Sequence, residues 1–316
     1  MNYQKGSLPL IVLVLITFIG LSLFFFLGKI YQKSVTLIPS PFPQTTPSQM
    51  GLRFDFSPGK SDPFNDLSGP FYHQVFLSNS PDGVNFTKGE LLFDKASAPD
   101  IVRLPNGRLL AYMVDGAGRS KSGIIVALSD DNGKSWDIGS LQLKNRKSTG
   151  TADPEVILTR SGNIKLFYVS FLGKNNAVMS AVSEDGVNFE EEEGIRFQYP
   201  QITDPDLIFI NDKWFMYLSQ GSKLIATSSD DGLTFKSENT IREKGSVSNT
   251  VYVDVDFYRQ FYCFEGKIKS AKTSDGLNFQ DEPGFRLEPD KGKAICDPAP
   301  VHLGGSWLML YKVSNH

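Results

Sequence analysis

The sequence predicts an all-β fold, a five-bladed β-propeller closed by its N- and C-terminal strands. Two alternating phrases and the order in which they occur predict it. The first phrase has the form Ser/Thr-x-Asp-Gly-x-x-aromatic, with one extra residue in its second copy. Its five copies begin at Ser80, Ser129, Ser183, Ser229 and Thr273. Their glycines lie 44 to 53 residues apart, and such a period is typical of stacked or radial units.

The second phrase begins near a proline, continues as an apolar run and ends in a run with a tyrosine 12 to 14 residues later. Runs such as 165–170 and 214–219 are rich in aromatic and β-branched residues and too short for helices, so they predict strands. Its copies start at Ala98, Asp153, Asp204, Asn249 and Asp297, and the tyrosines are Tyr112, Tyr168, Tyr217, Tyr262 and Tyr311. One unit is therefore four short strands.

The order of the phrases is circularly shifted. The first turn phrase, with Asp82, comes before any proline-to-tyrosine pair, and the last pair, 298–313, has no turn phrase after it. The simplest closure has the N-terminal strands complete the blade that the C-terminal strands begin. Such a ring has few exposed strand edges.

The turn phrases are predicted to be structural fasteners. Their Asp side chain can accept backbone N–H groups across the turn, and their Gly can adopt a positive φ. The aromatic residue that follows is expected to pack between neighbouring sheets.

The first 50 residues differ in composition from the rest of the chain. Residues 8–27 are almost entirely apolar and long enough to span a bilayer, which predicts an uncleaved signal anchor at 1–33. Residues 34–50 contain four prolines among Ser and Thr and predict an extended linker. The propeller is assigned to 51–316. We expect a single-pass cell-membrane protein with its propeller outside the cytoplasm.

Composition excludes some classes of function. A net charge of −3 without a basic stripe gives no electrostatic footprint for nucleic acid. The three histidines and two cysteines have no metal-ligand spacing, and no metal or cofactor is expected. Cys263 and Cys296 lie near strands of the fourth and fifth blades, where they form either a disulfide or two buried free thiols.

Carboxylates gather at the predicted starts of the innermost strands, which line the mouth of a propeller's central funnel. Acids that share one axis repel one another, so some pKa values rise while others stay low, as cleavage of a glycosidic bond requires. The catalytic candidates are Asp100, Asp153, Asp204 and Asp206. The candidates for substrate binding are Glu155, Tyr199, Asn249, Tyr252 and Asp297. The alternative is that an Asp before Pro only caps its turn.

These features resemble the five-bladed propeller glycoside hydrolases of families 43 and 32, the arabinanase, levansucrase and invertase group. The resemblance covers residues 51–316 and rests on the Asp-Pro strand starts, the Tyr strands and the turn phrases, which also look like sialidase Asp-boxes. It implies a carbohydrate partner and a glycosidase with an Asp, an Asp and an acid Glu on successive inner strands. Asp153 matches the second of these. Ala98 precedes the first proline, and Asp204 and Asp206 stand where the Glu is expected.

The resemblance leads to a membrane-anchored, extracytoplasmic glycosidase that needs no cofactor. A non-catalytic propeller that binds glycan or protein at the cell surface is the alternative, and the two departures from the family pattern favour it. A third reading is an envelope protein whose funnel is filled and inert.

Overall fold

The computed structural model describes residues 51–315 except 55, 58, 148, 173, 174, 255 and 256. The predicted anchor and linker, 1–33 and 34–50, therefore lie outside the described residues. Within the described part of the chain, no helix has the length and hydrophobicity needed to cross a membrane.

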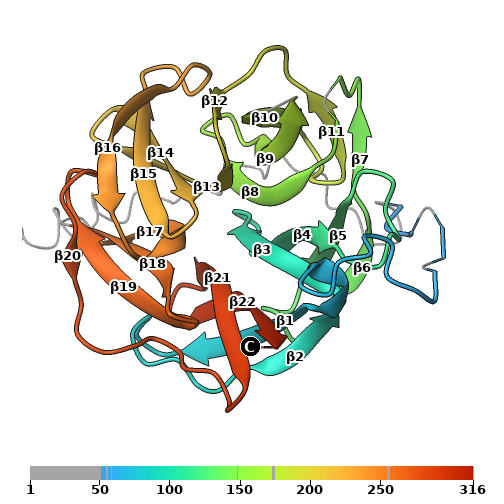
Figure 1. Ribbon diagram of the computed structural model, residues 1–316, viewed down its shortest axis with the longest axis horizontal. Coiled ribbons are helices and arrows are strands. Elements are labelled where there is room, and N and C mark those ends of the chain that lie inside the picture. Colours follow the sequence, from blue (N-terminus) through green and yellow to red (C-terminus); the bar gives the residue numbers. More distant parts are fainter. Residues whose placement is uncertain are drawn as a thin grey trace, which may run out of the picture. The chain divides into compact units, whose positions relative to one another are not determined.

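Residues 74–315 fold into five β-sheets arranged around a central axis (Figure 1). The first blade has the order β3-β4-β5-β6, the third β13-β14-β15-β16 and the fourth β17-β18-β19-β20. Their strands are β3 (Ala96–Arg103), β4 (Leu109–Asp115), β5 (Ile124–Ser129), β6 (Asp137–Ser140), β13 (Ile202–Ile210), β14 (Lys213–Gln220), β15 (Lys223–Ser229), β16 (Lys236–Arg242), β17 (Ser246–Asp254), β18 (Phe257–Phe264), β19 (Lys267–Thr273) and β20 (Gln280–Asp281). Each has the four antiparallel strands that one repeat predicts.

The second blade carries two additions to the repeat. Its order is β7-β11-β10-β9-β8, and β7 runs parallel to β11 while β12 pairs with β10. Its strands are β7 (Gln142–Lys144), β8 (Ala152–Leu158), β9 (Ile164–Leu172), β10 (Asn175–Ser183), β11 (Asn188–Glu191) and β12 (Phe197–Tyr199). The additions lie at its outer part, so the innermost strand β8 keeps the position that the repeat gives it.

The fifth blade closes the ring as predicted. Its order is β2-β1-β22-β21, built from β1 (Gln74–Ser80), β2 (Glu90–Asp94), β21 (Lys293–His302) and β22 (Trp307–Asn315). The N-terminal β1 pairs with the C-terminal β22 from Gln74↔Val313 to Ser80↔Trp307. A short 3-10 helix, Pro70–Tyr72, precedes β1.

Five apolar clusters form the described core, and each lies between two adjacent blades. The aromatic residues of the turn phrases take part in them: Phe189 meets Tyr112 edge to face at 5.8 Å, and Phe279 meets Tyr217 at 5.5 Å. Because each sheet buries both of its faces against its neighbours, the blades stabilise one another around the ring.

The turn phrases are confirmed as fasteners. In the third blade, Asp231 Oδ1 accepts the backbone N–H groups of Leu233 at 2.8 Å and Thr234 at 3.0 Å, and Gly232 has a φ of +70°. The same pattern occurs at Asp82, Asp131, Asp185 and Asp275. The two cysteines, left open by the sequence, form a disulfide between β18 and β21.

Candidate functional site

Every innermost strand begins with a β-bulge. One extra residue interrupts the pairing near the start of β3, β8, β13, β17 and β21. At each bulge one residue adopts a left-handed φ between +45° and +54°, which is typical of some bulges. These residues are Ala98, Asp153, Asp204, Val247 and Asp297. Proline follows four of them, and because proline has no N–H it suits a place where the ladder is interrupted.

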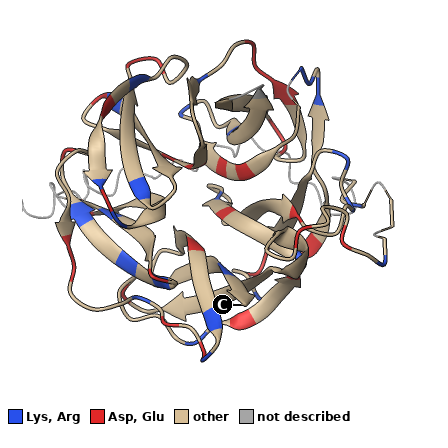
Figure 2. Cartoon of the chain, viewed as in Figure 1, with Lys and Arg blue, Asp and Glu red and all other residues tan. Residues whose placement is uncertain are grey.

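The bulges create two rings of side chains around the axis. The first ring consists of the left-handed residues just named. The second ring consists of the residues two positions later, namely Asp100, Glu155, Asp206, Asn249 and Ala299. Figure 2 shows acidic positions at the inner ends of several of these strands.

The second ring ties each blade to the next. Asp100 Oδ2 accepts the N–H of Val156 at 2.6 Å, and Glu155 Oε1 accepts that of Leu207 at 2.9 Å. Asp206 Oδ1 accepts that of Thr250 at 2.8 Å. Each accepted N–H belongs to the residue that follows the second-ring residue of the next blade. These acids thus satisfy backbone groups that would otherwise be buried without a partner.

Asn249 belongs to this second ring. The sequence placed it at the start of its strand, level with Asp153, but the bulge residue of the fourth blade is Val247. In the fifth blade, the residue that follows the second-ring Ala299 is Pro300, which has no N–H for Asn249 to accept. The Asn249 amide instead donates to Asp100 Oδ1 at 2.9 Å and to Glu155 Oε2 at 3.4 Å.

Burial dominates the electrostatics of the second ring. Asp100, Glu155 and Asp206 are each at most 5% exposed. Burial raises the pKa of Asp100 to about 6, and burial together with the neighbouring Asp100 raises that of Glu155 well above its ordinary value. Burial also raises the pKa of Asp206, although Ser248, Thr250 and Gln260 donate hydrogen bonds to its Oδ2. These contacts favour a structural role for the ring.

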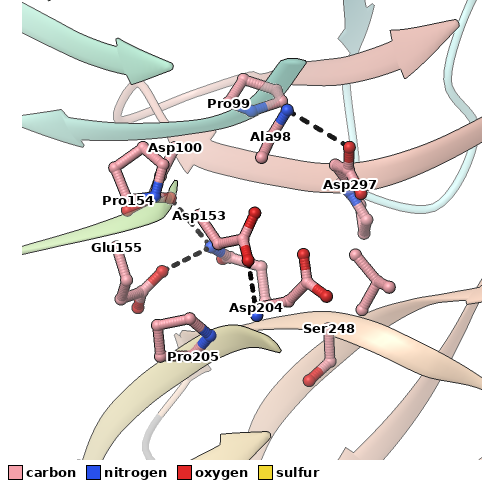
Figure 3. Close-up of a pocket in the computed structure, with 13 residues that line it drawn as sticks. Ala98, Pro99, Asp100, Asp153, Pro154, Glu155, Asp204, Pro205, Ser248 and Asp297 are labelled. Carbon is pink, nitrogen blue, oxygen red and sulfur yellow. Dashed lines mark hydrogen bonds between the residues drawn. The ribbon is translucent and has the colours of Figure 1, made fainter. Parts of the chain in front are cut away.

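The first ring faces the opening of the funnel. Asp153 Oδ2 lies 3.4 Å from the N–H of Asp204, and Asp297 Oδ2 lies 3.3 Å from that of Ala98 (Figure 3). Asp153 and Asp204 are only partly buried. Asp297 Oδ2 also forms an ion pair with Lys312 Nζ at 2.9 Å.

Mutual repulsion adds to burial in the first ring. Burial, followed by Asp204 and Asp297, raises the pKa of Asp153 well above its ordinary value. Burial and Asp297 raise that of Asp204 to about 6. Burial alone would lower the pKa of Lys312, but the three aspartates raise it. Burial and mutual repulsion thus favour the protonated forms of Asp153 and Asp204, while Asp297 is held in an ion pair with Lys312.

The space between these groups is small. Its accessible volume is about 30 Å³, lined by both rings and the prolines between them. A buried water molecule needs roughly 10–15 Å³ by this measure, so one or two waters fit between the acids. A sugar ring would have to lie over the first ring, on its open side.

The two predicted tyrosines lie apart from this opening, and neither lines it. Tyr199 is exposed on β12, opposite Asn176, whose amide donates to Ile202 O near the start of β13. It therefore lies at the same end of the blades as the funnel mouth. Tyr252 pairs with Tyr258 near the far end of β17, away from Val247.

Lys312 is the site residue that sequence reasoning missed. It follows the tyrosine of the fifth blade, where the other four blades have Met113, Val169, Leu218 and Cys263. A lysine in a position that the repeat otherwise fills with apolar residues or cysteine was the available signal. In the described residues no group of acids, histidines and cysteines has the arrangement of a metal site.

No protein-family model matches the chain, and no curated protein matches it in sequence. Solved structures do match its fold. A protein of unknown function from Dyadobacter fermentans is 15% identical with a TM-score of 0.56, covering 77% of this chain and 84% of that one. An endo-1,4-beta-xylanase from Bacteroides thetaiotaomicron is 18% identical with a TM-score of 0.54, covering 67% and 82%.

An endo-arabinase from Bacteroides thetaiotaomicron has the same architecture, at 12% identity and a TM-score of 0.51 over 68% of this chain and 88% of that one. The described chain is thus a five-bladed β-propeller that resembles glycoside hydrolase folds. At these identities the likeness concerns the fold, and the chemistry has to be argued from the two rings.

Proposed function

We propose that this protein cleaves a glycosidic bond with the three aspartates of its first ring. The observation that carries the proposal is their convergence from three blades on one opening, with different electrostatic surroundings. Glycosidic cleavage needs one carboxyl group that gives a proton and another that stays ionised.

Asp204 is the proton donor in this proposal. It occupies the third-blade position at which the resembling family has its acid, and its pKa of about 6 is close to neutral, where proton transfer is most effective. Asp153 stands beside it and accepts the Asp204 N–H. Its role is to hold the donor in place, while burial and Asp297 keep the pKa of the donor raised.

Asp297 takes the place of the missing first-blade acid. Its carboxyl group reaches the backbone of Ala98, and Lys312 holds it as an ion pair. In the reaction the bond from the anomeric carbon to the leaving oxygen breaks, and Asp204 protonates that oxygen. Asp297 takes a proton from a water that adds to the anomeric carbon, and the space of about 30 Å³ accommodates this water.

Membrane anchoring is part of the same proposal. The apolar residues 8–27 and the proline-rich linker support a propeller held outside the cytoplasm by one N-terminal helix. Protease treatment of intact cells tests this, because an external propeller is digested while a cytoplasmic control protein survives.

The test of function is reducing-sugar release by the full-length chain, purified in detergent, from a broad panel of polysaccharides and aryl glycosides. Asp204→Asn and Asp153→Asn are measured beside it. We expect release by the wild type and a loss of roughly 100-fold or more in Asp204→Asn, the size typical of a general acid. A folded wild-type protein that releases nothing from any substrate contradicts the proposal.

A glycan-binding propeller is the second candidate, favoured by one observation. Ala98 stands where the family has an acid, and with Val247 in the fourth blade only three of five first-ring positions carry carboxylates. Saturable binding of a polysaccharide that persists without any cleavage would support this candidate.

A further inference from the structure

A larger cavity opens beside the funnel, on the fourth blade. Its volume is about 390 Å³, which lies within the range of small-ligand pockets. Its lining includes Lys244, Val247, Phe264 and Glu265, together with the Cys263–Cys296 disulfide. A sugar unit needs a space of this order, which the first ring does not offer.

This cavity and the funnel are neighbours. Val247 is part of the lining of both. The disulfide forms another part of its wall, and Cys296 directly precedes the first-ring Asp297. A ligand that lies over the first ring and extends towards the fourth blade therefore enters this cavity.

The lining offers the contacts that a sugar ring uses. Phe264 is half-buried, and Lys269 Nζ lies 5.2 Å from its ring centroid. Aromatic faces stack on the C–H faces of sugars, while hydroxyl groups bind charged side chains. Lys244 and Glu265 are exposed, and neither forms an ion pair with another described residue, so both are available to hydroxyl groups.

Two other cavities have a similar size but differ in lining and position. They measure about 400 and 420 Å³ and lie beside the turn phrases of the third and second blades. Both come with the repeat, and no aromatic residue lines either. Ser229, in the first of them, pairs with Trp214, which pairs with Phe209 at the far end of β13 from Asp204. Ser183, in the second of them, pairs with Ile164, which pairs with Leu158 at the far end of β8 from Asp153. Both cavities are therefore remote from the first ring.

We propose that the fourth-blade cavity binds one sugar unit of a glycan whose neighbouring unit lies over the first ring. The choice of a glycan rests on the proposed function. The inference adds that the ligand is an oligosaccharide or polysaccharide of at least two units, with Phe264 as the stacking residue of the second unit.

Calorimetric titration of the full-length chain in detergent tests this. The probes are linear oligosaccharides of xylose, arabinose, glucose, galactose and mannose, each in lengths of one to six units. The variants are Phe264→Ala and Lys244→Ala. The matched control is Phe285→Ala, since Phe285 also lies under a lysine, with Lys267 Nζ 4.4 Å from its ring centroid, and lies outside the cavity.

We expect the dissociation constant in one sugar series to fall about tenfold beyond one unit, the size of one good stacking contact. Phe264→Ala should remove most of this gain, Lys244→Ala part of it and Phe285→Ala none. Affinity that does not depend on length, equal loss in Phe264→Ala and Phe285→Ala, or no binding of any probe would overturn the inference.

The two proposals fail in different ways. Length-dependent binding without hydrolysis retains the subsite and removes the proposed reaction. Hydrolysis with equal affinity for short and long chains retains the reaction and removes the subsite.

Discussion

The two rings of side chains lie two residues apart on the same five strands, yet they do different things. Second-ring acids accept backbone N–H groups of the next blade and are buried, as Asp206 is at 0% exposure. First-ring acids lie at the bulges, partly exposed or paired with Lys312. Acids of both rings accept backbone N–H groups of the next blade, so the comparison teaches that the position relative to the bulge decides how far an acid is buried.

The fourth blade is the case in which the second ring has an amide instead of an acid. Its second-ring residue is an amide, Asn249, and the next blade offers Pro300 in place of an N–H donor. A carboxylate there would have no backbone group to satisfy. The second ring therefore lacks an acid in the blade whose neighbour has no N–H that needs an acceptor. This supports a structural role for the acids of the second ring.

Removal of a second-ring acid should have the largest effect on stability. Asp206→Ala leaves the Thr250 N–H and three side-chain donors without their acceptor, each at a cost of about 1–3 kcal/mol. We expect the free energy of unfolding to fall by about 3 kcal/mol or more, measured by urea denaturation. Asp153→Ala in the first ring should lose roughly 1 kcal/mol. Equal losses in the two variants would remove the distinction.

The first ring should also make stability depend on pH. The pKa of Asp204 rises from 3.8 in the unfolded chain to about 6 in the fold, so folding favours its protonated form. The contribution of protonated Asp204 to the free energy of unfolding is complete below pH 4 and is lost as the pH rises through about 6. Urea denaturation between pH 4 and 7 should show a smaller decline in Asp204→Asn than in wild type. Asp230→Asn, at an exposed turn, is the control and should keep the wild-type decline.

The Lys312 ammonium should limit how far the pKa values of the first-ring aspartates rise. It lowers the pKa values of Asp153 and Asp204, so Lys312→Met should raise that of Asp204 by roughly one unit, as for removal of a nearby opposite charge. Carbon-13 NMR titration of the aspartate carboxyl groups measures this. Lys165→Met, which removes a partly buried lysine paired with Glu192 on the second blade, should leave Asp204 unchanged. An unchanged Asp204 in Lys312→Met would contradict the assignment.

The smallest effect concerns the bulge itself. Val247 has a φ of +54°, which costs a β-branched residue about 1–2 kcal/mol, whereas Asn tolerates this conformation. Val247→Asn should raise the free energy of unfolding by about 0.5–1 kcal/mol in a thermal or urea melt. Val251→Asn, on the same strand, should lower it because Val251 packs against the apolar cluster between the fourth and fifth blades. A loss in both variants would mean that the bulge carries no strain.

Local chemistry in the sequence was enough to predict the fold. The turn phrases repeat because each must satisfy its own N–H groups within a few residues, as Asp231 does for Leu233 and Thr234. Their number predicted the blades, and their offset predicted the pairing of β1 with β22. The sequence alone also brought Asp153, Asp204 and Asp297 to one axis, because each starts an innermost strand.

Only the tertiary structure decided which acids face the opening. One extra residue in each bulge shifts the pairing of the strand, and this placed Asn249 in the second ring and Val247 in the first. The pairing of β21 with β22 brought Lys312 to Asp297, and the packing of the fourth blade against the fifth brought the two cysteines together. The physical reason is that a turn is built from neighbouring residues, whereas a funnel is built from residues about 50 positions apart, whose contacts depend on how the blades pack.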